Sequence, residues 1–372
     1  MGSTAGGDDG DNRAGAGNHH PVPHRRNHGD YLAMRQIVLK EPRHLSLAEA
    51  PVPTPALDDL LVEVKASAIC GTDQHIYTGH TPVSYPRVPG HEVTGIVHGA
   101  GAGVTAFKVG DRVIVNPNLD CNNCERCLLG RENLCVNAQL MGRDVDGTLR
   151  EFLTIPQTHA FKLPTPLSFE EGTLLQPLST VVHAQIRTCI KPTESVAVVG
   201  LGASGLMHVQ VSKLSGAYPV IAVGRSRWKL DLAEQMGADI LVDAGQEDPV
   251  AQVRRLTGGH GADVTIEAVG IPETLHQSIK MTKPGGRVMG FGISPKPLPS
   301  LDLYQMYLTE MTLIFPRATT RADFQRTVDL VESNRLNLKP LLTQRYSLEE
   351  ASLAFKFADE EVSKVLRIVM TP

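Results

Sequence analysis

The feature that most constrains the fold is a glycine pattern that directly follows an apolar run. The residues after Val196 read Ala-Val-Val and lead into G-x-G-x-x-G, after which a helical stretch begins. In a strand–turn–helix unit the first glycine makes the tight turn, the second admits a pyrophosphate, and the third lets helix and strand pack closely. The helix N-terminus adds free N–H groups and partial positive charge. We therefore predict a dinucleotide site at Gly200, Gly202, Ala203, Ser204 and Gly205; a glycine-rich turn without a ligand is the alternative.

Two different patterns divide the rest of the chain. Apolar strands alternate with helical stretches over residues 179–316, which indicates βαβ units and a doubly wound parallel sheet of the Rossmann type. Residues 34–178 show short β runs broken by Gly and Pro, which are typical of an antiparallel, barrel-like domain. Helices are expected near 321–333 and 348–359, before a closing strand near 365–370. We expect residues 317–372 to rejoin the first domain, which is therefore split.

Composition excludes several classes of protein. The 372 residues carry a net charge of −4, so no basic excess is available to bind nucleic acid. No apolar run of about 18 residues could span a membrane, and no apolar signal core begins the chain. We expect a cytoplasmic protein. Residues 1–33 are polar and almost free of apolar side chains, which predicts a disordered tail.

The end of the second strand of the parallel sheet determines which nicotinamide cofactor is preferred. An NAD site usually carries an acidic residue there, which accepts hydrogen bonds from the ribose hydroxyls. This chain has Gly224 followed by Arg225 and Arg227, with no carboxylate at the strand end. The glycine leaves room, and arginines form forked hydrogen bonds with a 2′-phosphate. We therefore expect NADP to be preferred to NAD; the alternative is that the arginines are solvated surface charge.

Four of the six cysteines fall in one short loop, at Cys121, Cys124, Cys127 and Cys135. Four thiolates so spaced can close a tetrahedral zinc site that has no open position for a substrate. Clustering of this kind in a large, reduced chain favours a metal over disulfides. We predict a structural zinc; a disulfide pair is the alternative.

A second set of metal-binding residue types is scattered: Cys70 within Cys-Gly-Thr-Asp, and His91 followed by Glu92. Taken singly, a cysteine or a histidine is usually structural. Their joint occurrence with a cofactor fold and a four-cysteine loop makes them candidate ligands of a second, catalytic zinc.

These motifs together resemble the zinc-containing medium-chain alcohol dehydrogenases, in the branch of sorbitol, threonine and butanediol dehydrogenases. The resemblance runs from Met34 to the C-terminus and rests on Cys70-Gly-Thr-Asp, Gly90-His-Glu, Val109-Gly-Asp-Arg-Val, the four-cysteine loop, Gln176-Pro-Leu-Ser and the glycine turn. It implies a split GroES-like β-barrel catalytic domain around a Rossmann domain. It also implies two zinc ions per chain and a homodimer or homotetramer.

The resemblance assigns roles to individual residues. It implies that Cys70 and His91 bind catalytic zinc, with Glu92 as the third ligand in sorbitol-type members. In other members that glutamate pairs with a basic residue, here Arg367, and the third ligand aligns with Gln176. An amide is a poor zinc ligand, so we expect Gln176 beside the zinc-bound water or the substrate.

The resemblance also places a proton relay at Thr72 and His75. Asp73 either supports a zinc ligand or caps a loop. Among the other residues, Cys189 is expected to be buried in a helix, His183 to be structural, and Arg317 to lie near the substrate.

The function that follows is zinc-dependent, NAD(P)-linked interconversion of a secondary alcohol or polyol and its ketone, with a small-molecule substrate. One alternative is an NADPH-dependent ketone or enone reductase in which catalytic zinc is weak or absent. The other is a nucleotide-binding structural or regulatory protein without catalysis.

Overall fold

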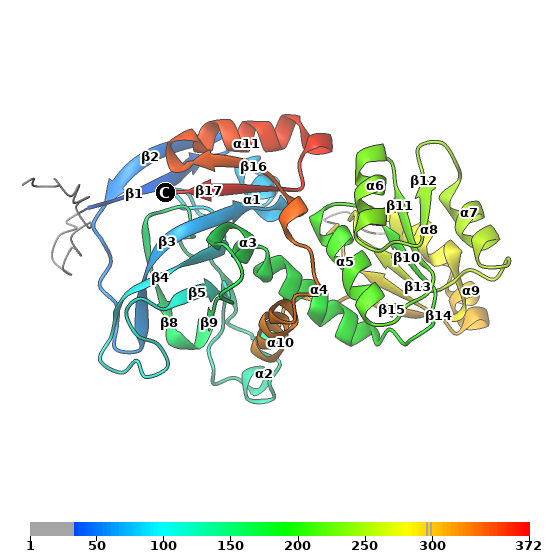
Figure 1. Cartoon of the computed structure of the whole chain (residues 1–372), viewed down its shortest axis with the longest axis horizontal. Coiled ribbons are helices and arrows are strands. Elements are labelled where there is room, and N and C mark those ends of the chain that lie inside the picture. Colours follow the sequence, from blue (N-terminus) through cyan, green and yellow to red (C-terminus); the bar gives the residue numbers. More distant parts are fainter. Residues whose placement is uncertain (1–32, 295–296, 298–299) are drawn as a thin grey trace, which may run out of the picture.

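The computed structural model describes residues 33–294, 297 and 300–372. The predicted disordered tail, residues 1–33, lies outside these residues except for Ala33. Two large sheets occupy opposite ends of the molecule, with helix α4 (Leu175–Thr188) between them (Figure 1). Within the described residues no helix is long and apolar enough to cross a membrane.

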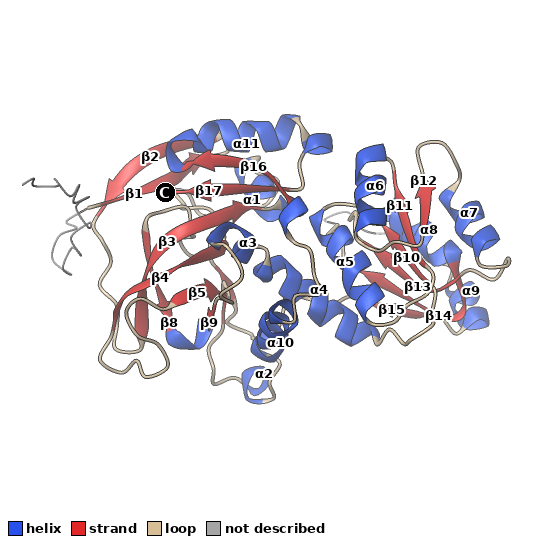
Figure 2. Ribbon diagram, in the orientation of Figure 1, coloured by secondary structure: helices blue, strands red, loops and turns tan. Residues whose placement is uncertain are grey.

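One large sheet has six parallel strands in the order β12-β11-β10-β13-β14-β15. Sequence order therefore reverses at β10, as in a doubly wound Rossmann sheet. Because both faces of the sheet are covered, the central strands β10 and β11 are continuous apolar runs. Figure 2 shows helices on both sides of this sheet. The strands are β10 (Val196–Val199), β11 (Val220–Gly224), β12 (Ile240–Asp243), β13 (Ala262–Glu267), β14 (Thr282–Gly290) and β15 (Thr312–Ile314). The helices are α5 (Ala203–Leu214), α6 (Arg227–Gln235), α7 (Pro249–Leu256), α8 (Pro272–Met281) and α9 (Leu303–Thr309).

The other large sheet has seven strands in the order β16-β17-β3-β4-β5-β9, with β8 also paired to β3. The pairs around β3 are antiparallel, and the alternating side chains of these strands line a separate apolar core. The strands are β3 (Asp59–Ile69), β4 (Glu92–Ala100), β5 (Arg112–Val115), β8 (Phe152–Pro156), β9 (Ala160–Lys162), β16 (Leu342–Ser347) and β17 (Arg367–Thr371).

The C-terminal segment closes this sheet. Strand β17 pairs with β3, which pairs with β4, so the last strand lies in the same sheet as strands from the first half of the chain. Helices α10 (Arg321–Glu332) and α11 (Ala351–Glu360) match the two expected helices closely. The remaining elements are β1 (Met34–Glu41), β2 (His44–Ala50), β6 (Asn118–Leu119), β7 (Gln139–Leu140), α1 (Gly71–Tyr77), α2 (Glu125–Leu128) and α3 (Phe169–Thr173).

Candidate active site and metal centres

The antiparallel pairing of β3 and β4 brings the first candidate ligands together. Ala68 lies opposite Glu92 in the register, so Cys70, just after β3, faces His91, just before β4. The Cys70 Sγ is 3.0 Å from His91 Nε2. Donor atoms of Cys70, His91 and Glu92 all lie within 4.8 Å of one another, and all three residues are buried. Thiolate, imidazole and carboxylate are the donors that zinc prefers, so this set fits a zinc ion.

Asp73 ties the two ligand segments to each other. It is fully buried, and one carboxylate oxygen accepts the amide N–H of Cys70 at 2.9 Å. The other oxygen accepts the amide N–H of Gly90 at 3.0 Å and lies 3.3 Å from His91 Nδ1. Burial alone would lower the pKa of His91, but the charges of Asp73 and Cys70 outweigh it and raise that pKa. Asp73 therefore fixes the orientation of both candidate ligands.

The loop before His91 requires a glycine. Gly90 has a φ of +97°, and a Cβ there would lie 2.7 Å from Thr148 Oγ1 and 3.1 Å from the backbone nitrogen of Leu149. A larger residue would displace the loop that carries His91.

Glu92 has a second partner. Arg367 Nε on β17 lies 3.2 Å from Glu92 Oε2 across β3. Burial raises the pKa of Glu92, while the Arg367 guanidinium opposes that rise. The alternative partner expected from the sequence is thus in contact with Glu92, although the carboxylate still lies within reach of the other two donors.

Helix α1 carries the expected relay residues on one face. Thr72 is half-buried and donates its amide N–H to Cys70 Sγ at 3.2 Å. His75, one turn later, is exposed. The pair thus runs from the candidate metal site to the surface, because residues three apart share a helix face. Gln176 is buried in the first turn of α4, a helix that contacts β4 and β5.

The four-cysteine loop forms a compact cluster. The Sγ–Sγ distances are 3.5 Å for Cys124–Cys127, 3.9 Å for Cys124–Cys135 and 3.5 Å for Cys121–Cys135. Sulfurs at the corners of a tetrahedral zinc site are about 3.8 Å apart, whereas bonded sulfurs are about 2.05 Å apart. All four thiols are free. The cluster therefore fits a zinc ion and contradicts the disulfide alternative.

Residues that are distant in the sequence form ion pairs and hydrogen bonds with this loop. They were not identified from the sequence. The buried Asp120 carboxylate is 2.6 Å from the Arg321 guanidinium and 3.0 Å from His159 Nε2. These groups outweigh burial and lower the pKa of Asp120. The position of Asp120, directly before Cys121, was the only local signal.

The glycine turn has the geometry that its three roles require. Gly200 has a φ of +97°. A Cβ at Gly205 would lie 1.9 Å from the Gly200 oxygen, so only glycine lets helix α5 pack there. A Cβ at Gly202 would meet nothing within 4 Å, which leaves that side of the turn open to a ligand. Ala203 and Ser204 form the first turn of α5, whose leading amides have no helical partner.

The residues expected to select the cofactor differ in their contacts. Gly224 ends β11, and Arg225 and Arg227 are both exposed. Arg227 pairs with Asp231 at 2.7 Å, one turn along α6. Arg225 forms no side-chain hydrogen bond or ion pair with any described residue. Asp243, the acidic residue at the end of the neighbouring strand β12, accepts a hydrogen bond from the amide N–H of Gly245 at 2.9 Å.

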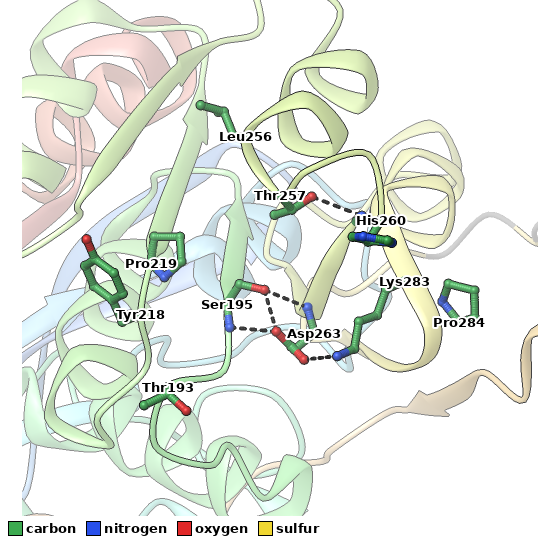
Figure 3. Close-up of a pocket in the computed structure, with 11 residues that line it drawn as sticks. Thr193, Ser195, Tyr218, Pro219, Leu256, Thr257, His260, Asp263, Lys283 and Pro284 are labelled. Carbon is green, nitrogen blue, oxygen red and sulfur yellow. Dashed lines mark hydrogen bonds and ion pairs between the residues drawn. The ribbon is translucent and has the colours of Figure 1, made fainter.

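A cavity of about 600 Å³ lies at the opposite edge of this sheet (Figure 3). It is lined at the amino ends of the strands, where Asp263 accepts hydrogen bonds from the Ser195 hydroxyl at 2.6 Å and amide at 2.9 Å. Lys283 pairs with the same carboxylate. These groups satisfy one another, and ligands of such sheets bind at the carboxyl ends, so we assign this cavity no binding role.

The structure also shows the environments of His183 and Cys189. His183 is structural as expected, since its Nδ1 lies 2.7 Å from the buried Asp323 carboxylate. The expectation that Cys189 is buried in a helix was wrong. Cys189 is exposed and ends α4 in the left-handed conformation, with a φ of +55°, because the chain must leave the helix there for the next strand.

Comparison with known proteins agrees with this description. Residues 56–165 match the alcohol dehydrogenase GroES-like domain, and residues 187–333 match the zinc-binding dehydrogenase domain. L-threonine 3-dehydrogenase of Symbiobacterium thermophilum is 35% identical over 335 residues, covering 88% of this chain and 94% of that protein. Sorbitol dehydrogenase of Bacillus subtilis is 32% identical, covering 91% of this chain and 97% of that protein.

A solved structure is also similar. A zinc-binding dehydrogenase from Sinorhizobium meliloti, bound to NADP, superimposes with a TM-score of 0.84 at 31% identity, covering 91% of this chain and 99% of that chain. The predicted GroES-like and Rossmann architecture is thus confirmed. The chain belongs to the zinc-containing medium-chain alcohol dehydrogenase family of oxidoreductases.

Proposed function

We propose that this protein interconverts a secondary alcohol or polyol and its ketone, using catalytic zinc and NADP(H). The proposal rests on the buried cluster of Cys70, His91 and Glu92, whose donor atoms lie within 4.8 Å of one another. Zinc bound there would lower the pKa of a substrate hydroxyl, and the nicotinamide would accept the hydride. Relatives named threonine and sorbitol dehydrogenases support this substrate class.

Side chains of the protein would transfer the proton of the substrate hydroxyl to the solvent. The Thr72 hydroxyl would take the proton of the substrate hydroxyl while giving its own proton to the next group of the relay. This role is supported by the contact of the Thr72 amide N–H with the candidate ligand Cys70 Sγ at 3.2 Å. The exposed His75 imidazole, one turn later, would pass the proton to water. Gln176, buried in the first turn of α4, would orient the substrate by hydrogen bonds from its amide, since an amide is a poor base.

NADP is the proposed cofactor because Arg225 is exposed, without an ionic partner among the described residues, directly after Gly224. A 2′-phosphate would pair with this guanidinium. The NADP bound in the Sinorhizobium relative supports the proposal.

Two features favour a second function. The Arg367–Glu92 contact occupies one carboxylate oxygen, and Gln176 replaces a stronger donor, so the catalytic zinc would be weakly held. In that case the protein would reduce a ketone or enone with NADPH and without catalytic zinc.

We propose a homodimer or homotetramer in the cytoplasm. Support comes from exposed apolar side chains on α9 and just after β15. In the family that this chain resembles, the last strand of the nucleotide domain, here β15, pairs across a two-fold axis. The exposed side chains are Leu303, Tyr304, Tyr307, Leu308 and Phe315.

The test is a panel of polyols and secondary alcohols with NADP, measured for the wild type, Thr72→Ser and Thr72→Val. We expect the serine variant to keep most of the activity and the valine variant to lose at least about 100-fold in kcat, since it has no hydroxyl. Oxidation of no alcohol, together with zinc-independent reduction of a ketone by NADPH, would favour the second function.

A further inference from the structure

A second cavity, of about 350 Å³, lies between the four-cysteine loop, the C-terminal half of α4 and the start of α10. Figure 1 shows α2, α4 and α10 close together in this region. None of the candidate catalytic-zinc ligands and none of the glycines of the nucleotide turn lines it. The cavity is thus separate from the candidate catalytic zinc site and from the nucleotide turn, while the four-cysteine loop forms one of its walls.

The lining of this cavity is strongly basic. Each of its walls contributes an arginine: Arg131 from the loop, Arg187 from α4, Arg317 after β15 and Arg326 from α10. The side chains of Arg131, Arg187 and Arg317 form no hydrogen bond or ion pair with other described residues. Like charges gathered in a concave surface raise the local positive potential, which attracts anions.

Among the described residues that line the cavity, Asp323 is the one carboxylate, and it already has partners. Asp323 accepts a hydrogen bond from the Thr320 hydroxyl at 3.0 Å and pairs with His183 at 2.7 Å and with Arg326. These partners outweigh burial and lower the pKa of Asp323. The negative charge of Asp323 is therefore balanced by these partners. It does not neutralise the positive charges of the other three arginines.

Fixed polar groups connect the walls of the cavity. The Asn133 side-chain amide donates to the Arg317 carbonyl at 2.9 Å and lies 3.4 Å from His183 Nε2. Asn133 and His183 are both buried. The loop, α4 and the segment after β15 are thus linked, so the arginines are carried by a preorganised frame.

We propose that this cavity binds a phosphate-bearing anion, either inorganic phosphate or a small phosphomonoester. Arginines recognise phosphate through paired N–H groups, and several of them balance its two negative charges. The volume is close to the lower limit of small-molecule sites, which suits a small anion rather than a dinucleotide. This site is additional to the proposed dehydrogenase function and does not depend on it.

The test uses the zinc-loaded full chain and isothermal titration at constant ionic strength, with chloride as the competing salt. Inorganic phosphate and glycerol 3-phosphate are titrated separately, because the tighter ligand identifies the source of the phosphate. We expect saturable binding, and a dissociation constant raised on the order of tenfold or more in the variant with Arg131→Ala and Arg187→Ala. Both side chains are exposed, so their removal should leave the fold intact.

A matched variant separates this cavity from the cofactor site. Arg225→Ala with Arg227→Ala removes two exposed arginines of the proposed cofactor site, neither of which lines the cavity, so saturable binding of phosphate in the cavity should persist. Binding that is lost only in this control variant would overturn the proposal, because phosphate would then occupy the cofactor site. Absence of saturable binding would overturn it as well.

Discussion

Arg367 Nε lies 3.2 Å from Glu92 Oε2, and the two side chains meet across strand β3 with 12% and 1% of their surface exposed. This contact joins the last strand of the chain to a candidate zinc ligand. A buried charge that loses its partner is costly, so the pair can be tested by removing the arginine.

We predict that Arg367→Met lowers the free energy of unfolding of the zinc-loaded protein by roughly 3–5 kcal/mol. Urea denaturation measures this loss. Arg345→Met is the control, because Arg345 pairs with Glu170 at the surface at 2.6 Å, and such pairs contribute about 1 kcal/mol or less. A loss no larger than the control would show that another charge, such as zinc, balances Glu92.

Asp73→Asn should weaken the catalytic centre without removing any ligand. The Asp73 carboxylate accepts hydrogen bonds from the amide N–H groups of both Cys70 and Gly90. Mutation of a group that orients metal ligands typically lowers metal affinity or activity by about 10–100-fold. Zinc affinity at this centre and kcat/KM are the measurements. An unchanged zinc affinity would assign Asp73 a purely local role in capping α1.

The two arginines after β11 should contribute unequally to cofactor choice. Arg225→Ala should raise the KM for NADPH on the order of tenfold and hardly change that for NADH, because only NADPH carries the 2′-phosphate. Arg227→Ala should have a smaller effect, since Asp231 already pairs with Arg227. Equal changes for both cofactors, or a lower KM for NADH in the wild type, would contradict the NADP assignment.

His208 should make the fold sensitive to acid. Burial lowers the pKa of His208 to about 3, and Gln185 Nε2 lies 3.2 Å from its Nδ1. Between pH 6.5 and pH 3 the unfolded chain binds a proton that the folded chain excludes, so stability falls as the pH falls. The expected loss between pH 7.5 and pH 5 is about 2 kcal/mol.

Urea unfolding at several pH values measures this slope. His208→Asn keeps an acceptor for Gln185 and removes the titrating ring, so its slope should be smaller by about one proton. Equal slopes for variant and wild type would show that other groups cause the acid sensitivity.

Much of the fold could be predicted from sequence because its signals are local. Apolar runs and the glycine turn predicted the strands of the parallel sheet; the first was expected at residues 195–199, and β10 spans Val196–Val199. The four cysteines lie within 15 residues, so their clustering was visible in the sequence. A closing strand near residues 365–370 was also predicted from its apolar run, and β17 spans Arg367–Thr371.

The supporting contacts could not be predicted because they join distant segments. Asp120 and Arg321 are 201 residues apart, and His183 and Asp323 are 140 residues apart. No periodicity connects such pairs; only the packing of α10 against α4 and the four-cysteine loop does. Cys189 misled the prediction because helical periodicity continues to Thr188 and does not show that the next residue turns outward.

The metal content of purified variants tests most directly the proposal that each chain binds two zinc ions, one in each centre. Zinc per chain is measured for the wild type, Cys70→Ser, Cys124→Ser and the exposed control Cys189→Ser. We predict two zinc ions for the wild type and the control, and one for each of the other variants. One zinc in the wild type that is lost with Cys124→Ser and kept with Cys70→Ser would contradict the catalytic zinc site.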